Sequence, residues 1–233
     1  MALCFFPIVS RCIQLQHLAL DGGPLENEQE DSLPPVSIES QTIISLTLRY
    51  TNRAECAKLF PLLQFPRLHV LEMDHCNLPA GSTYPSSFIA HSTSITSLSL
   101  KYTKFSLEDV LALLRLLPTV THFLFYQYSC KGALDDFFSN LRHAHPSESR
   151  TLLPRLTHME VEILFYNDEG DPATSAFVEV VKNQVAENRL KSVRFSVPAH
   201  TLNRGLISSL AYLPKVGIAI NIQDKCVVCE VTQ

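Results

Sequence analysis

Hydrophobic residues recur along the chain in a short pattern, apolar-x-x-apolar-x-apolar, that occurs eight times. The eight copies are Leu15-Leu18-Leu20, Ile43-Leu46-Leu48, Leu68-Leu71-Met73, Ile95-Leu98-Leu100, Val120-Phe123-Phe125, Leu156-Met159-Val161, Leu190-Val193-Phe195 and Leu213-Val216-Ile218. Their first positions are separated by 28, 25, 27, 25, 36, 34 and 23 residues. Alternation with a period of two is typical of a strand with one buried face. Each copy therefore predicts a strand whose first, fourth and sixth positions face a core.

Between these copies the hydrophobic period changes to that of a helix. The clearest case is Ser106–Pro118, where Ser106 is a favourable N-cap and Pro118 blocks continuation of the helix. Further helices are expected over Arg53–Gln64, Gly132–Ala144, Ala173–Asn188 and Leu202–Leu213, with a short one near Pro85–His91. Alternating strands and helices predict a parallel inner sheet with an outer row of helices.

The spacing of the first copies matches the ~20–29-residue period of leucine-rich repeats. The copy that begins at Leu68 also has Cys76 and Leu78 at the later positions of that pattern, and Thr103 takes the place of Cys76 in the next copy. We expect these small polar side chains to bond the backbone of the turn that leaves the strand. The sequence thus predicts one α/β leucine-rich-repeat domain over residues 1–233, a horseshoe-shaped solenoid with a parallel inner sheet of about eight strands and outer helices.

Two segments do not follow this repeat pattern. Residues 21–40 contain six carboxylates, three prolines and no basic residue, which predicts an exposed, mobile acidic loop. A tolerated surface insertion is the favoured interpretation of this loop, and an acidic docking segment is the alternative. Residues 213–233 alternate apolar and polar positions near their end and predict a terminal strand pair that forms a C-terminal cap.

Composition narrows the choice of partner and compartment. The net charge is −4 and the pI about 6.1, so no nucleic-acid partner and no polybasic membrane contact are expected. No apolar run is long enough to span a bilayer. The seven cysteines are odd in number and irregularly spaced, unlike a disulfide framework. Together these features predict an intracellular protein, cytoplasmic or nuclear.

Motifs for catalysis or cofactor binding are not recognisable in the sequence. No Gly-x-Ser-x-Gly, Walker A, Rossmann or His-Glu-x-x-His motif occurs. Cys226 and Cys229 have the Cys-x-x-Cys spacing, but Val227 and Val228 between them favour a strand, in which the two thiols would point to opposite faces. We therefore expect a structural role for this pair, no metal, no cofactor and no enzymatic activity.

The third, fifth and seventh positions of each copy should lie on the concave face of the sheet. In the eighth copy these positions are Lys215, Gly217 and Ala219. The candidate partner-binding residues on this face are Arg49, Glu72, Asp74, Lys101, His122, Leu124, Tyr126, His158, Glu160, Glu162 and Arg194. The central residues His122, Leu124, Tyr126 and Tyr128 combine aromatic area with polar tips, as binding anchors do. Acidic residues on both sides predict a partner with an apolar centre and basic edges, although ordinary solvated strand residues are an equally good interpretation.

Three phrases carry a family resemblance: Phe65–Met73, Leu117–Phe125 and Leu153–Val161. They resemble the leucine-rich tails of fungal F-box-like proteins, in which Leu-Pro-x-Leu-x-x-Leu-x-Leu recurs after each helix. The resemblance implies that the repeats recruit a target protein, while an F-box binds a Skp1-type adaptor of a ubiquitin ligase. The fourteen residues that precede Leu15 are too few for an F-box.

The expected function is therefore a non-enzymatic module that binds a protein partner of unknown identity on its concave sheet. One alternative is the substrate-recognition subunit of an SCF-type ubiquitin ligase, which would bind a Skp1-type adaptor only if an F-box lies upstream. A second alternative is a leucine-rich GTPase activator.

Overall fold

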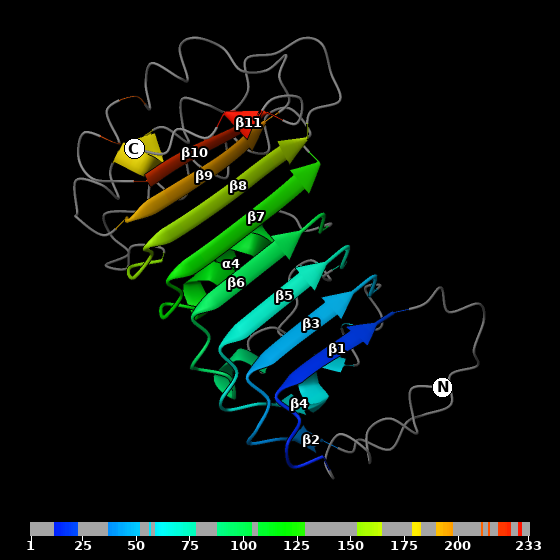
Figure 1. Ribbon diagram of the computed structural model, residues 1–233. Coiled ribbons are helices and arrows are strands. Elements are labelled where there is room, and N and C mark those ends of the chain that lie inside the picture. The colour runs from blue at the N-terminus through cyan, green and yellow to red at the C-terminus, as the bar shows by residue number, and fades with distance from the viewer. Residues whose placement is uncertain are drawn as a thin grey trace. The chain divides into compact units, whose positions relative to one another are not determined.

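The structure is a computed structural model that divides into two compact units, Met1–Thr119 and Val120–Gln233, called here the first and second unit. It describes residues 12–22, 37–51, 56, 59–77, 88–103, 107–128, 153–164, 179–182, 190–197, 211, 214, 219–224 and 228–229. Strands dominate the described part of each unit (Figure 1).

The first unit contains a parallel sheet in which successive repeats lie side by side (Figure 1). Its strands, in spatial order, are β1 (His17–Asp21), β3 (Ser45–Arg49), β5 (Val70–Asp74) and β6 (Ser97–Lys101). The pairing aligns His17 with Ser45, Ser45 with Val70, and Val70 with Ser97. These residues are the third positions of the first four sequence copies, so the predicted alignment of these repeats is confirmed.

The second unit repeats this arrangement and ends in one antiparallel strand. Its strands, in spatial order, are β7 (His122–Tyr128), β8 (His158–Leu164), β9 (Ser192–Val197), β10 (Ala219–Asp224) and β11 (Val228–Cys229). The first four are parallel, and β11 pairs antiparallel with β10. The terminal strand pair expected from the alternation is present, while its role as a cap stays a prediction.

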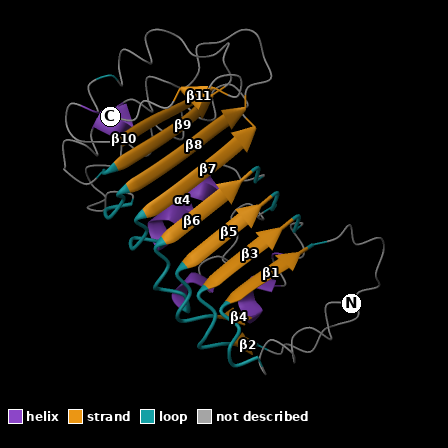
Figure 2. Ribbon diagram, in the orientation of Figure 1, coloured by secondary structure: helices purple, strands orange, loops and turns teal. Residues whose placement is uncertain are grey.

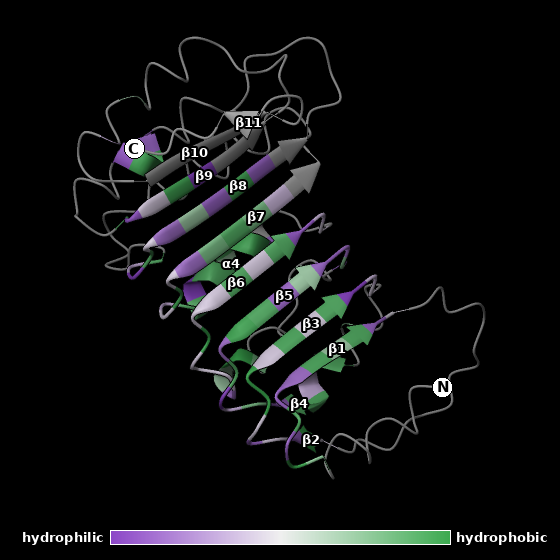
Figure 3. Cartoon of the chain, viewed as in Figure 1, coloured by the Kyte–Doolittle hydropathy of each residue, from purple (hydrophilic) through white to green (hydrophobic). Residues whose placement is uncertain are grey.

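Side chains alternate between a buried and a more open face along the strands, as Figure 3 shows by the alternation of hydrophobic and hydrophilic residues. The fourth and sixth positions of the second and third copies, which include Leu46 and Met73, are at most 1% exposed. First positions are buried as well from Ile43 to Leu190, for example Ile43 and Val120, whereas Leu15 is only partly buried. Ser99 departs from the rule because it belongs to the open face and is nevertheless buried.

Five strands, β3, β5, β6, β8 and β9, start with the same backbone hydrogen bonds. One carbonyl oxygen accepts two successive amide hydrogens from the next repeat. The oxygen of Ile44, for example, accepts from His69 and Val70 at 2.8 and 3.0 Å. The carbonyls of Gln16, His69, Thr121 and Thr157 do the same. This regularity holds neighbouring strands in a constant register.

Threonine side chains add a second set of bonds at the same edge. Thr42 donates its hydroxyl to the carbonyl of Leu15 at 2.8 Å, and Thr119 donates to that of Ile95 at 2.7 Å. In each case the acceptor is the first residue of the preceding copy, so the hydroxyl ties one repeat to its neighbour.

The observed helices match the predicted helices in part. The expected helix at Ser106–Pro118 is confirmed as α4 (Leu107–Leu116), which lies behind β6 in Figure 2. The expectation over Arg53–Gln64 is wrong at its end, because Phe60–Leu62 form a 3₁₀ turn, η2, and Leu63–Gln64 form strand β4. Residues 88–90 and 179–182 are helical within two other expected helices.

The predicted loop at residues 21–40 is too long at both ends. Asp21 belongs to β1, and Ile38–Glu39 form strand β2, which pairs parallel with β4. Ile38 and Leu63 are both buried in this pair. Burial of these two apolar side chains is what draws the end of the segment into a strand.

The eighth sequence copy was placed four residues too early. β10 aligns Ala219 with Ser192, and Asn221 with Arg194, so these two residues take the third and fifth positions of the repeat. Lys215 and Gly217 lie outside the described residues. Counting back from Ala219 in the sequence puts Gly217 at the first position of this copy, where the other copies have an apolar residue.

Several expectations fall outside the described residues. These are the helix over Gly132–Ala144, the helix over Leu202–Leu213 apart from Ala211, and the position of Cys226. Neither sheet is curled within its own unit (Figure 1), and the horseshoe curvature stays a prediction, as does the single domain. Among the described helices, none is long and apolar enough to cross a membrane.

The alternation of faces predicts a large difference in stability between two substitutions in β3. Leu46→Ala removes a side chain with 0% exposure, and we expect it to lower the free energy of unfolding by about 2–5 kcal/mol in urea titrations. Arg49→Ala, at an exposed end of the same strand, should change it by less than about 0.5 kcal/mol. Similar losses for both variants would contradict the assignment of faces.

Candidate functional site

The second unit places most of the predicted partner-binding residues together on one open sheet face. Parallel pairing aligns β7 with β8 and β8 with β9. The residues brought together are His122, Leu124 and Tyr126 from β7, His158, Glu160 and Glu162 from β8, and Arg194 from β9. We call this surface the second-unit face.

A polar network crosses three strands of this face. The Tyr126 hydroxyl donates a hydrogen bond to Oε1 of Glu160. From the other side, Nη1 of Arg194 lies 3.3 Å from Oε1 and 3.4 Å from Oε2 of the same carboxylate. Glu160 is thus held between a phenol and a guanidinium on its two neighbouring strands, which fixes the tyrosine ring in one orientation.

The electrostatics of Tyr126 follow from this arrangement. Burial of the ring raises the pKa of Tyr126 above its ordinary value, and its hydrogen bond to Glu160 acts in the same direction. The negative charges of Glu160 and Glu162 raise the pKa further, whereas Arg194 lowers it. Tyr126 therefore stays protonated and continues to donate to Glu160 at neutral pH.

Two histidines stack at the start of the same strands. The rings of His122 and His158 lie 4.2 Å apart between centroids and are nearly parallel, at 4°. Each Nδ1 is hydrogen-bonded to the hydroxyl of the preceding residue, at 2.9 Å from Thr121 and 2.8 Å from Thr157. The Thr157 hydroxyl also donates to the Thr121 carbonyl at 3.0 Å. A hydroxyl has one hydrogen to donate, so with both bonds formed His158 supplies the hydrogen from Nδ1.

Within this stack, His158 favours its neutral form. Burial is the largest cause that lowers the pKa of His158, followed by the charges of His122 and Lys191. In the described part of the chain, no third His, Cys, Asp or Glu joins the pair in a metal-binding cluster.

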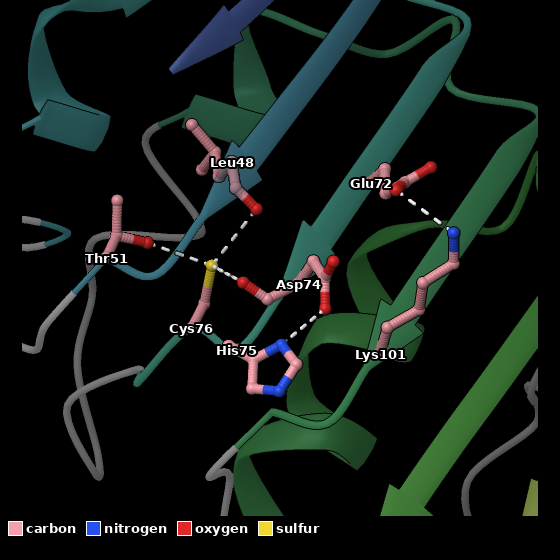
Figure 4. Close-up of polar contacts among 7 residues, drawn as sticks. All are labelled: Leu48, Thr51, Glu72, Asp74, His75, Cys76 and Lys101. Atoms are coloured by element: carbon pink, nitrogen blue, oxygen red, sulfur yellow. Dashed lines mark hydrogen bonds and ion pairs between the residues drawn. The ribbon is translucent and has the colours of Figure 1, made fainter. Parts of the chain in front are cut away.

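The first unit holds the other predicted residues, and it pairs two of them, Glu72 and Lys101, with each other. Lys101 Nζ lies 3.0 Å from Glu72 Oε1, and Asp74 Oδ1 lies 2.7 Å from His75 Nδ1 (Figure 4). Arg49 is exposed at the end of β3. The expected arrangement of acid on both sides of an apolar centre joins residues of two units and stays a prediction.

Sequence reasoning missed a row of rings at the carboxyl ends of the first-unit strands. Tyr50, His75 and Tyr102 each follow directly after a strand, and all three have positive φ angles of 51°, 52° and 49°. The left-handed conformation costs a non-glycine residue about 1–2 kcal/mol. The ring centroids lie 5.0 Å apart in both neighbouring pairs. The one available signal was an aromatic or imidazole residue at the same place in three successive copies.

The turn residues after these rings form an inward-facing polar cluster. Thr51 donates its hydroxyl to Cys76 Sγ at 2.8 Å, and Cys76 lies 3.3 Å from the Leu48 carbonyl and 3.5 Å from that of Asp74 (Figure 4). Cys56 in turn donates to Thr51 at 3.3 Å. For Cys76, the predicted bonding of the turn backbone is present in the geometry. Thr103 is buried at the same place.

The thiol of Cys76 is more acidic than an ordinary cysteine thiol. The hydrogen bond from Cys56 is the largest cause that lowers the pKa of Cys76 to about 7, while burial opposes it and bonds from Thr51 assist. Both thiols are, however, 0% exposed. A thiol that no substrate can reach acts as a structural group, so this cluster holds the turn together.

Comparison with known proteins adds no family to these observations. Neither a protein-family model nor a curated protein matches this chain. Any assignment of function therefore depends on the chain's own repeats and on the geometry of its open faces.

The histidine stack predicts a measurable pKa dependence. In NMR titrations of the imidazole protons, we expect the pKa of His158 to lie below its ordinary value of 6.5. His122→Phe should raise the pKa of His158 part of the way back, since burial remains, and His69→Gln in the first unit should leave it unchanged. An unshifted pKa in the His122 variant would contradict the interaction.

Protonation of His158 also affects the free energy of unfolding. Because the pKa of His158 is lowered on folding, the unfolded chain binds this proton more tightly. Its contribution to the free energy of unfolding should be present above about pH 6.5 and decrease as the pH falls. His158→Gln should reduce the slope of stability against pH in this range, measured by urea unfolding at each pH.

Burial of the thiols predicts selective alkylation. With iodoacetamide under native conditions, we expect rapid modification of Cys12, which is exposed, and protection of Cys56 and Cys76. Adding urea should make Cys76 react, and mass spectrometry of proteolytic peptides would follow each site. If Cys76 reacted as fast as Cys12 in the folded protein, its thiol would be accessible, and Cys76 could then act as a nucleophile.

Proposed function

We propose that this protein is a non-enzymatic interaction module of the leucine-rich-repeat type that binds a protein partner on the second-unit face. The observation that carries the proposal is the network of Tyr126, Glu160 and Arg194, which fixes an aromatic side chain on an open sheet face. An aromatic ring held in place before binding loses little conformational entropy on association.

The repeat type is supported by the periodicity and by the hydrogen bonds between strands. Copies spaced by 25–28 residues pair in parallel with equivalent positions aligned. The doubly accepting carbonyl recurs at the start of strands in both units. Repeat scaffolds of this kind present a continuous surface for recognition.

The chemistry of the face indicates the kind of partner it suits. Leu124 lies between the histidine stack and Tyr126 along β7 and offers a partly exposed apolar side chain. Glu160 and Arg194, on the neighbouring strands, supply both signs of charge. Such a face matches a partner with an apolar or aromatic residue at its centre and polar groups around it.

The decisive experiment measures affinity after the partner has been identified. Proximity labelling and affinity purification would provide the partner, and titration calorimetry with the purified pair would give Kd. We expect Leu124→Ala and Tyr126→Ala each to weaken binding by about thirtyfold, corresponding to a loss of about 2 kcal/mol.

A matched control uses an exposed residue of the same unit outside this face. Arg155→Ala, in the turn that precedes β8, should change Kd by less than about twofold. If Leu124→Ala and Tyr126→Ala leave Kd unchanged while the proteins stay folded, the second-unit face is not the binding surface. Loss of binding in all three variants would also contradict a localised site.

A further inference from the structure

Tyr50, His75 and Tyr102, called here the aromatic row, each place a ring at a turn. The turn itself does not require a ring at this position. In each repeat the residue after the strand must turn the chain so that the next residue, such as Thr51 or Cys76, enters the core. A positive φ angle does this, and glycine adopts it at lowest cost.

The first repeat makes the equivalent turn with glycine. Gly22 follows β1 and donates its amide to the Arg49 carbonyl at 2.7 Å. Tyr50 donates in the same way to the Asp74 carbonyl at 2.9 Å, and His75 to the Lys101 carbonyl at 2.8 Å. The backbone bond is thus made equally well without a ring, and three rings in a strained conformation indicate a role for the side chains.

The aromatic row is open at the end that adjoins Gly22. Register places Gly22 next to Tyr50, just as Tyr50 is next to His75. Since glycine has no side chain, no ring among the described residues lies beside the face of Tyr50 that is turned away from His75. Tyr50 is 59% exposed, a high value for a large hydrophobic residue. The rings repeat at 5.0 Å, so one more planar group would fit above Gly22 at the spacing of the strands.

The charge around this open position favours a cation. Asp21 is exposed directly before Gly22, and in the described part of the chain it has no ion pair. Arg49 is the opposing charge, exposed beside Asp21 in register. The face of the Tyr50 ring attracts cations as well, so the ring and the Asp21 carboxylate together provide two groups that a cation could contact.

We propose that the open position above Gly22 binds an arginine side chain of a protein partner. Its planar guanidinium would stack on Tyr50 as the next member of the aromatic row, and its charge would pair with Asp21. Arginine combines planarity with permanent charge and both stacks on aromatic faces and bonds carboxylates in a forked geometry. The site lies in the first unit and shares no residue with the second-unit face, so either proposal can fail without the other.

The test uses a short Gly/Ser peptide with one central arginine, titrated into the full chain with ¹³C-labelled tyrosine rings. We expect saturable shifts of the Tyr50 resonances and an upfield shift of the arginine Cδ protons, which a ring stacked on the guanidinium would cause. Tyr50→Leu and Asp21→Asn should each weaken binding on the order of fivefold. Tyr102→Leu, at the other end of the row, is the matched control and should retain binding.

Two further peptides test whether the site prefers a positively charged side chain. Replacing arginine by citrulline keeps a planar group but removes the charge, and should weaken binding on the order of fivefold. A phenylalanine peptide that binds as tightly as the arginine peptide would overturn the proposal in favour of a neutral aromatic partner. Unchanged binding in Tyr50→Leu would also overturn it. If Tyr50→Leu fails to fold, the Asp21→Asn variant and the citrulline peptide still test the proposal, because both leave Tyr50 in place.

Discussion

The doubly accepting carbonyl at the start of the strands is the constraint on which the rest of this structure depends. The oxygens of Gln16, Ile44 and His69 each hold two amides of the next repeat, and those of Thr121 and Thr157 do so in the second unit. These bonds fix where each strand begins relative to its neighbour. Because side chains alternate, a shift of one residue would move every apolar side chain to the open face and every polar one into the core.

At the other end of the strands, the turns couple local strain to packing. A left-handed residue brings Thr51 and Cys76 inward, where they bond each other and Cys76 also bonds the carbonyls of Leu48 and Asp74. The Cys76 thiol thus adds hydrogen bonds at the turn beside the backbone bond from the Tyr50 amide to the Asp74 carbonyl. The strain of the turn and the polar cluster in the core are thus two consequences of one change in chain direction.

Constant register also gives the open faces their chemistry. Glu160 can contact both Tyr126 and Arg194 only because β7, β8 and β9 present these residues in adjacent rows. The stack of His122 on His158 has the same origin, since both follow a threonine at the same place in their strands. A short side-chain network of this kind holds its members in fixed positions on the sheet.

The sequence by itself determined the strands and their buried faces, because a period-two pattern is local and each strand reports its own faces. The helix at Leu107–Leu116 was equally readable from its ends. The sequence-based prediction was wrong for the register of β10, because Gly217 stands where the other copies have an apolar residue. It also missed the strand at Ile38, because the burial of Ile38 depends on Leu63, which is distant in the sequence.

Only the tertiary structure decided how the surface residues combine. The network around Glu160 and the rings of Tyr50, His75 and Tyr102 depend on distances across strands that are 25 to 34 positions apart in the chain. The positive φ angle that aims each ring is imposed by the turn and is unexpected for tyrosine or histidine. Composition and spacing reveal which residues face outward, whereas contacts between them follow from the register of the folded sheet.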